Sequence, residues 1–251
     1  MQLDLYLQLQ QYFMHMALAS ARIMPCFMLL PFFTNNVLSG TLRLPVAMLV
    51  GLALWPAEHP VIEDGGYSFL VMVITKEAII GLIIACFISL PFWVLHAVGS
   101  MIDNQRGATL SSSIDPISGV DTSELANFLN LFSAVLVLQN GGLVVMMEVF
   151  QHSYQLWQPL TLDVPGIHNI LTFLGIVVSR ALVIASPVII VFLLSELLLG
   201  MLARFSPQLN SFSLALTVKS LIGFLLLLLY FTPVFPYKII EMMFYPVFQE
   251  V

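Results

Sequence analysis

Charged residues are scarce in this sequence, and that scarcity excludes most soluble folds. Asp, Glu, Lys and Arg together make up 9% of the chain, whereas a soluble globular domain carries about 25%. Hydrophobic residues reach 59%, and the mean hydropathy is +0.98. So few charges cannot cover a water-facing surface. The apolar surplus must therefore face lipid, other subunits, or both.

Positive charge and cysteine are also scarce. The eight Lys and Arg residues are scattered and the net charge is −6, so the chain has no basic patch for nucleic acid, and we expect no such partner. Cys26 and Cys86 each stand alone in an apolar stretch, which favours buried thiols over a disulfide framework. The first twenty-one residues contain no Lys or Arg. We therefore expect no cleavable signal peptide.

Motifs for catalysis and for phosphate binding are missing as well. The sequence contains no GxSxG, HExxH, GxxxxGK[ST] or GxGxxG, and its five histidines show no metal-ligand spacing. The prediction is a protein that is not an enzyme, with no catalytic residues, no cofactor and no metal site.

What the sequence does contain is a series of long apolar blocks. They cover residues 12–33, 44–55, 78–102, 125–147, 170–200 and 221–236. The block at 78–102 has no charge and is long enough to cross a bilayer, which takes about 20 apolar residues, but Pro91 inside it predicts a kink or a break. We found no linker and no repeat. These features predict one all-α domain over residues 1–251, with kinked or broken helices.

Several charges lie within the apolar blocks or at their margins, where simple membrane topology would not place them. Charges at such depth usually face a protein interior or a water-filled path, so we expect a protein packed into a larger helical assembly. The candidate buried-charge or interface residues are Lys76, Glu77, Glu196, Arg204 and Lys219.

Glu196 and Arg204 are eight residues apart with Gly200 between them. On one continuous helix they would lie about 12 Å apart along the axis, which is too far for a direct pair. Either each charge contacts another subunit or a polar channel, or the helix ends near Gly200 and Arg204 lies in water.

An unusual polar segment separates the third and fourth apolar blocks. Asp103 and Arg106 are spaced to pair on one helical turn, Gly107 gives the backbone freedom, and a run of small hydroxyl residues follows. The candidate plug or pore-loop residues are Asp103, Arg106, Gly107, Thr109, Ser111, Ser112, Ser113, Asp115 and Pro116. Two interpretations remain open: a re-entrant loop or plug that lines a conduit, or a solvent-exposed connection.

Two local signals predict helix details. Asp121, with Glu124 three residues on, resembles a capping box before the apolar run at 125. Gly81, Ala85 and Ser89 form a small-residue stripe where a neighbouring backbone can approach, although such spacing also arises by chance.

The same polar strings resemble those of a known family. Residues 102–116 read IDNQRGATLSSSIDP and are similar to the signature of the SctT family, the T-type export-gate subunit of type III secretion systems, in its SpaR-like branch. The flagellar protein FliR is a relative of this family. Further matches occur in the same order at residues 121–124, 139–142, 185–187, 194–196, 204–210 and 216–220.

The resemblance implies a structural, pore-forming export-gate subunit built from hydrophobic helical hairpins in the bacterial inner membrane, part of it raised toward the periplasm. The implied partners are R-type and S-type gate subunits, a U-type switch protein and a V-type subunit nearby, and membrane lipid. Unfolded effector proteins are the implied substrates, and the segment 106–123 is the implied plug. The chain ends at Val251, so we expect no contacts through a long basic tail. The alternative function is a polytopic transporter or channel for a small solute.

Overall fold

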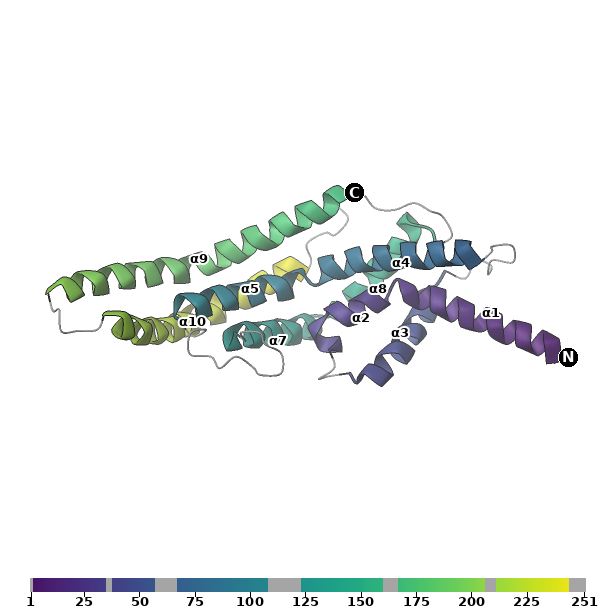
Figure 1. The fold of residues 1–251 in the computed structure, drawn as a ribbon, viewed down its shortest axis with the longest axis horizontal. Helices are drawn as coiled ribbons and strands as arrows, with labels where there is room; N and C mark the ends of the chain where they lie inside the picture. Colours follow the sequence, from purple (N-terminus) through teal and green to yellow (C-terminus); the bar gives the residue numbers. More distant parts are fainter. Residues whose placement is uncertain are drawn as a thin grey trace. The chain divides into compact units, whose positions relative to one another are not determined.

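A computed structural model of the protein describes residues 2–34, 38–56, 67–107, 123–159, 167–205 and 211–243. Every regular element in these ranges is a helix (Figure 1). The all-α class predicted from the apolar blocks is therefore confirmed. The described residues divide into two compact units.

The first unit contains Met1–Ser89 and Gly141–Thr172. Its helices are α1 (Gln2–Ala21), α2 (Met24–Leu29), α3 (Gly40–Leu54), α4 (Tyr67–Ile88) and α8 (Gly142–Leu156), with a short 3-10 helix at Pro31–Phe33. Helix α4 is central, because α1, α2 and α8 all pack against it. Helix α3 packs against α1 and α8. Apolar side chains such as Leu18, Leu70 and Val73 fill the space between them.

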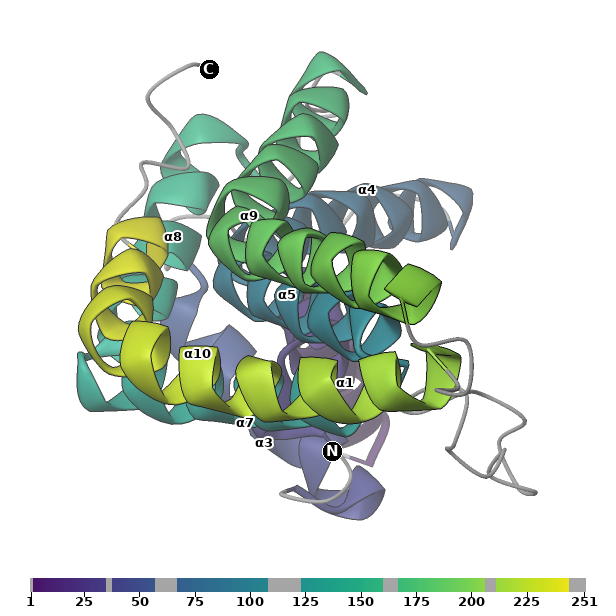
Figure 2. The same cartoon turned by 90° about the vertical axis from the view of Figure 1, so that its left-hand side faces the viewer.

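The second unit contains Leu90–Asn140 and Phe173–Pro246. Helices α5 (Leu90–Gln105) and α7 (Glu124–Gln139) pack closely as a hairpin, and α10 (Ser211–Met243) packs against both of them (Figure 2). The long helix α9 (Ile167–Phe205) begins in the last residues of the first unit and continues through the second. Gly99 of α5 lies against the backbone of Ala126 in α7, and this contact allows the two helices to pack closely.

The predicted break at Pro91 is confirmed. Helix α4 ends at Ile88 and α5 begins at Leu90, so Pro91 occupies the first turn of a helix, where its missing N–H leaves no hydrogen bond unmade. The span expected at residues 78–102 is corrected by the same break. The apolar span is Ser68–Ile88, which begins earlier and includes Lys76 and Glu77.

A second helix is also long and apolar enough to cross a membrane, at Val178–Leu202 within α9. Helices α7 and α8, separated only by Asn140 and Gly141, bring the total among the described residues to three if they are counted together as one broken span. Gly141 has a φ of 80°, a left-handed conformation that glycine adopts without strain.

The predicted start of α7 needs a correction. Its N-cap is Ser123, whose Oγ accepts a hydrogen bond from the backbone N–H of Ala126 at 3.1 Å. Glu124 is the first residue of the helix, and Asp121 lies outside the described residues. Ser is as good an N-cap as Asp, so residue type alone does not distinguish Ser123 from Asp121.

The small-residue stripe on α4 is a site of close helix packing. An added Cβ at Gly81 would collide with the backbone carbonyl of Arg22, while Ala85 and Ser89 are both fully buried. The chain between α1 and α2 therefore passes directly over the Gly81 face of α4.

Gly81→Ala should destabilise the first unit by about 1–3 kcal/mol, the usual cost of overpacking, because the clash is with backbone and no side chain can move aside. Gly200→Ala is the matched control, since nothing lies within 4 Å of a Cβ at Gly200 in α9. Thermal denaturation of the full chain in detergent compares the two variants. Equal melting temperatures would contradict the close approach at Gly81.

Candidate functional site

The buried charges of the first unit form one group, which we call the Arg22 cluster: Arg22, Lys76 and Glu77. Arg22 and Glu77 are fully buried, and Lys76 nearly so. Arg22 Nε donates to Glu77 Oε2 at 2.6 Å, and Lys76 Nζ lies 3.0 Å from Glu77 Oε1. One carboxylate therefore balances two cations, and these pairs connect the α1–α2 junction to α4.

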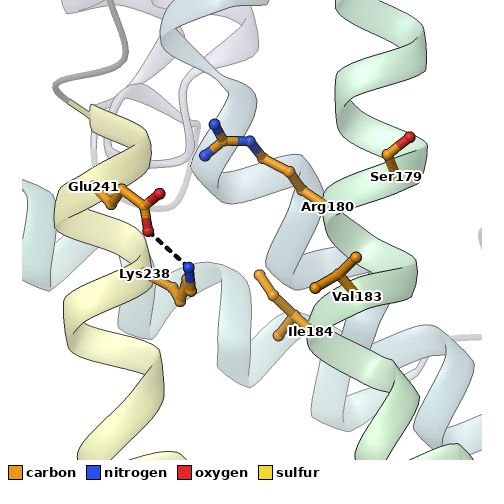
Figure 3. Close-up of a pocket in the computed structure, with 6 residues that line it drawn as sticks. All are labelled: Ser179, Arg180, Val183, Ile184, Lys238 and Glu241. Carbon is orange, nitrogen blue, oxygen red and sulfur yellow. Dashed lines mark hydrogen bonds and ion pairs between the residues drawn. The ribbon is translucent and has the colours of Figure 1, made fainter.

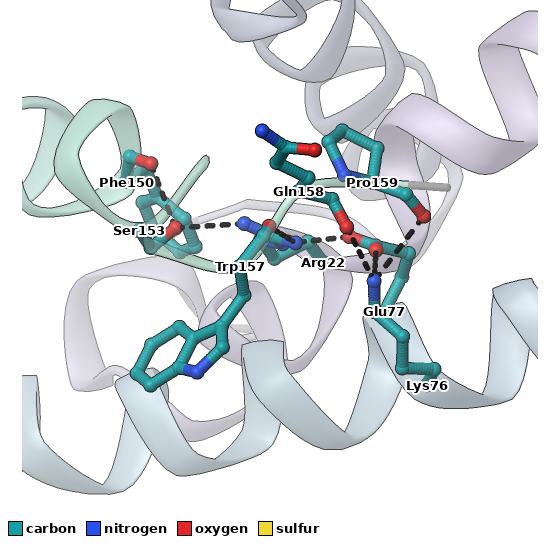
Figure 4. Close-up of polar contacts among 8 residues, drawn as sticks. All are labelled: Arg22, Lys76, Glu77, Phe150, Ser153, Trp157, Gln158 and Pro159. Atoms are coloured by element: carbon teal, nitrogen blue, oxygen red, sulfur yellow. Dashed lines mark hydrogen bonds and ion pairs between the residues drawn. The ribbon is translucent and has the colours of Figure 1, made fainter. Parts of the chain in front are cut away.

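The end of α8 accepts hydrogen bonds from the two terminal nitrogens of Arg22 (Figure 4). Arg22 donates to Ser153 Oγ at 3.1 Å and to the Trp157 carbonyl at 2.9 Å. Its guanidinium also lies over the Tyr154 ring, 4.1 Å from the ring centre. Because the last carbonyls of a helix have no intrahelical partner and carry partial negative charge, they suit a cluster with surplus positive charge.

Lys76 also binds main-chain carbonyls, in the segment that follows α8. Its Nζ donates to the carbonyls of Gln158 at 2.7 Å and Pro159 at 3.2 Å. The chain that leaves α8 is thus held by two cations from elsewhere in the first unit. The cluster joins α4, the α1–α2 junction and the end of α8, which is the geometry of a structural clamp.

In the second unit, Asp103 is 1% exposed and its carboxylate contacts both ends of the polar segment. Oδ1 accepts from Arg106 Nε at 2.7 Å, as the spacing predicted. Oδ2 accepts from Ser123 Oγ at 2.6 Å and from the backbone N–H of Leu125 at 3.1 Å. We call these contacts of Asp103 with Arg106, Ser123 and Leu125 the Asp103 clip.

The rest of the predicted pore loop falls partly outside the described residues. Gly107 is described and has a φ of 72°, consistent with a turn directly after α5. The remaining candidates, Thr109, Ser111, Ser112, Ser113, Asp115 and Pro116, lie outside the described ranges.

Glu196 and Arg204 do not pair with each other. Helix α9 continues past Gly200 to Phe205. Of the two alternatives, a helix end near Gly200 is therefore excluded, and Arg204 is an exposed residue of the last turn of α9. Glu196 instead accepts from Lys219 Nζ of α10 at 2.9 Å. Lys219 is buried, whereas the Glu196 side chain is 58% exposed, so this carboxylate retains a face open to another molecule.

An open cleft of about 230 Å³ lies between α9 and α10 (Figure 3). Its polar lining is Ser179, Arg180, Lys238 and Glu241, above the aliphatic side chains of Val183 and Ile184. Lys238 donates to Glu241 at 2.8 Å, and this hydrogen bond lowers the pKa of the Glu241 carboxyl. The pair is exposed and one turn apart, so it contributes little to stability.

Sequence reasoning did not include Arg22, Ser123 or Ser153 among the candidate site residues. The partners of these residues are distant in sequence: Arg22 and Glu77 are 55 residues apart, Ser123 and Asp103 are 20 apart, and Ser153 and Arg22 are 131 apart. No local spacing could therefore reveal these pairs.

Among the described residues, no group of His, Cys, Asp and Glu is arranged to hold a metal ion.

The fold and its charges define an all-helical membrane protein whose polar groups hold helices together. Comparison with protein families agrees: residues 13–244 match the family described as bacterial export proteins, family 1. The chain belongs to this family. It is a component of a type III secretion export apparatus in the inner membrane, and its family is one of export proteins and not of enzymes.

Individual relatives support the same assignment. The chain is 49% identical to the surface presentation of antigens protein SpaR of Salmonella typhimurium over 242 residues, 96% of this chain and 91% of that protein. It is 32% identical to the Yop proteins translocation protein T of Yersinia pestis, covering 83% and 82% of the two chains. It is 26% identical to the flagellar biosynthetic protein FliR of Buchnera aphidicola, covering 86% and 85%. The resemblance stated from the polar strings is confirmed.

Glu77→Leu should destabilise the first unit by about 3–5 kcal/mol, because it leaves two buried cations without their carboxylate. The double variant Arg22→Met with Glu77→Leu should be less damaging, since Lys76 keeps its two carbonyl partners. The exposed Glu241→Gln is the control and should shift the melting temperature little. Thermal denaturation of the full chain in detergent ranks the three; a double variant worse than Glu77→Leu would contradict the clamp.

Proposed function

We propose that the chain is a pore-forming structural subunit of the export gate, which conducts unfolded proteins across the inner membrane, and that residues 106–123 act as its plug. In this proposal residues 1–251 are one SctT/FliR-like export-gate domain, and part of it is raised toward the periplasm. The observation that carries the proposal is the exposed surface of α9, which combines a long apolar face with charge.

The exposed face of α9 is apolar but carries a charge that is poorly suited to lipid. Bulky apolar side chains such as Leu193, Leu197 and Met201 are exposed on this helix. Glu196 lies among them, with more than half of its side chain exposed. A charge at such depth is costly in hydrocarbon but is readily satisfied by a neighbouring protein. The surface therefore favours partner helices, with Glu196 and Arg204 at the interface.

The proposed partners follow from this surface together with the family. R-type and S-type gate subunits would cover the apolar helices, and the U-type switch protein and V-type subunit would lie nearby. Lipid would cover only what these subunits leave open. Unfolded effectors are the substrates, and this chain supplies the conduit, not the energy.

The plug proposal is supported by where the polar segment is attached. Its two ends belong to α5 and α7, which pack as a hairpin, and both ends meet at Asp103. A polar loop on a closed apolar hairpin can fill a lumen without separating the helices that hold it. Displacement by an arriving polypeptide then requires only a few kcal/mol between the two states.

The full chain should be recovered in one large hetero-oligomer when it is co-expressed with its R-type and S-type partners, and most of it should aggregate or be degraded without them. Affinity purification in detergent followed by native mass measurement tests this. Arg204→Ala should lower the yield of the complex, and Glu241→Gln, in α10 and outside the proposed interface, serves as its control. A stable lone chain that ignores those partners would favour the solute-transporter alternative.

Deletion of residues 107–113 should make the assembled gate leak ions, because the lumen would lose its polar filling. The measurement is membrane conductance, or dye and ion uptake, in cells that carry the assembled complex. Complex yield must match that of the wild type, since an unassembled gate reports nothing about the plug. An assembled deletion variant that is no leakier would rule out the plug.

A further inference from the structure

The cleft between α9 and α10 in the second unit brings two cations and one carboxylate to one place. The side chain of Arg180 extends from α9 toward Lys238 and Glu241 of α10 (Figure 3). The hydrogen bond from Lys238 lowers the pKa of the Glu241 carboxyl, and the charge of Arg180 acts in the same direction. The three charges therefore act on one another, and one positive charge remains in excess.

These charges can be reached from outside the protein. The Lys238 and Glu241 side chains are 39% and 42% exposed, and the cleft is open. A ligand can approach without any rearrangement of the two helices. Arg presents several N–H donors in one plane, which suits the oxygens of a phosphate group, and Lys adds a point charge. The cleft is thus complementary to a singly charged phosphate ligand.

Both walls of the cleft carry residues typical of the boundary between lipid and water. Arg180 lies two residues after the start of the candidate span Val178–Leu202, about 3 Å along the helix axis. On α10, Tyr237 is exposed, and the Lys238 ammonium lies 5.9 Å from the centre of its ring. Tyrosine rings and the heads of Lys and Arg are enriched at this depth, which is also the depth of lipid phosphates.

Toward the middle of the span the same side of α9 is apolar. Val183 lines the cleft, and Ile190 follows two helical turns later on the same side. Both side chains are more than half exposed. Half of the hydrocarbon core is about 15 Å thick, which corresponds to about ten residues of helix. An acyl chain whose head group lies at Arg180 would therefore end near Ile190.

The proposed partner interface lies farther along α9. Glu196 is 16 residues after Arg180, about 24 Å along the axis, and is thus beyond the reach of such an acyl chain. A lipid at the cleft and a partner helix at Glu196 would cover successive parts of the same helix.

We infer that the cleft between α9 and α10 is a binding site for an anionic phospholipid. The phosphodiester of the head group lies between Arg180 and Lys238. An acyl chain lies along Val183 and Ile190. Glu241 holds Lys238 and leaves a single positive charge to balance the phosphodiester. The inference rests on the membrane location of the chain and not on the proposed pore or plug, so it stands or falls separately from them.

Lipid-specific quenching of a fluorophore tests this site in the full chain. Val178 is exposed at the start of the span and does not line the cleft. It is replaced by Cys and labelled, with Cys26 and Cys86 changed to Ala. The protein, in the assembly that affinity purification recovers, is placed in phosphatidylcholine nanodiscs. These contain a small fraction of phosphatidylglycerol or phosphatidylcholine that carries a nitroxide near the top of an acyl chain.

The phosphatidylglycerol quencher should be effective at about one fifth of the mole fraction that the phosphatidylcholine quencher needs. One unbalanced basic residue near a membrane surface raises the attraction for anionic lipid by about this factor. Equal quenching by the two lipids would overturn the inference. So would the absence of quenching by either, which is the result expected if a partner chain fills the cleft.

Variants of the cleft test whether its charges cause the preference. The double variant Arg180→Gln with Lys238→Gln should abolish the preference for phosphatidylglycerol. Lys238→Arg keeps the charge and is the matched control, which should retain the preference. Glu241→Gln should increase it, because two positive charges are then unopposed. A preference that survives in the double variant places the lipid elsewhere and overturns the site.

A single variant keeps the test decisive if the double variant is not recovered. Lys238→Gln removes an exposed charge, which costs little stability. A weaker preference for phosphatidylglycerol in this variant supports the inference, and an unchanged preference overturns it.

A soluble competitor separates the lipid from its head group. Glycerophosphoglycerol, which is the head group without acyl chains, should leave the quenching unchanged at millimolar concentration, because it cannot contact Val183 and Ile190 as an acyl chain would. If it removes the preference, the cleft binds a soluble phosphodiester and the lipid proposal is overturned.

Discussion

Arg22 is fully buried, and the first unit is arranged so that each of its three guanidinium nitrogens has a hydrogen-bond acceptor. A lone cation in such a place would be prohibitively costly, so Glu77 of α4 and the end of α8 must both reach it. That requirement brings together segments that are far apart in sequence. It also explains Gly81. The backbone at Arg22 must lie close to α4 for the Arg22 side chain to bind Glu77, and α4 allows this approach where Gly81 has no side chain. The charge and the glycine are two parts of one constraint.

The second unit uses charge differently. Asp103 is enclosed like the charges of the first unit, and it holds two packed helices at the base of a polar segment. Glu196, by contrast, has a buried partner in Lys219 yet keeps most of its side chain exposed. In a water-soluble protein such a carboxylate would be ordinary. On an apolar helix of a membrane export protein, it indicates a place where another protein chain completes the surface, which is how we interpret α9.

Sequence reasoning succeeded where the cause is local and failed where it is not. Pro91 breaks the helix because its own ring forbids continuation, and Asp103 pairs with Arg106 because residues three apart share a helix face. The Arg22–Glu77 and Glu196–Lys219 pairs span 55 and 23 residues, so no spacing rule joins them. Sequence reasoning chose Asp121 as the N-cap, and residue type could not exclude Ser123 because Asp and Ser are equally good caps. In the structure the N-cap is Ser123, whose hydroxyl donates to the carboxylate of Asp103.

A conduit for unfolded protein must be closed at rest and must open without coming apart. These needs conflict if the closing element is also part of the wall. In the proposed gate, a closure on the polar segment, attached at a base with buried hydrogen bonds, would separate the two roles, because the helices that form the wall would keep their apolar packing. Gly107 suits this division: its positive φ ends α5 within one turn of Asp103, so the change from fixed helix to polar segment occurs directly beside the clip.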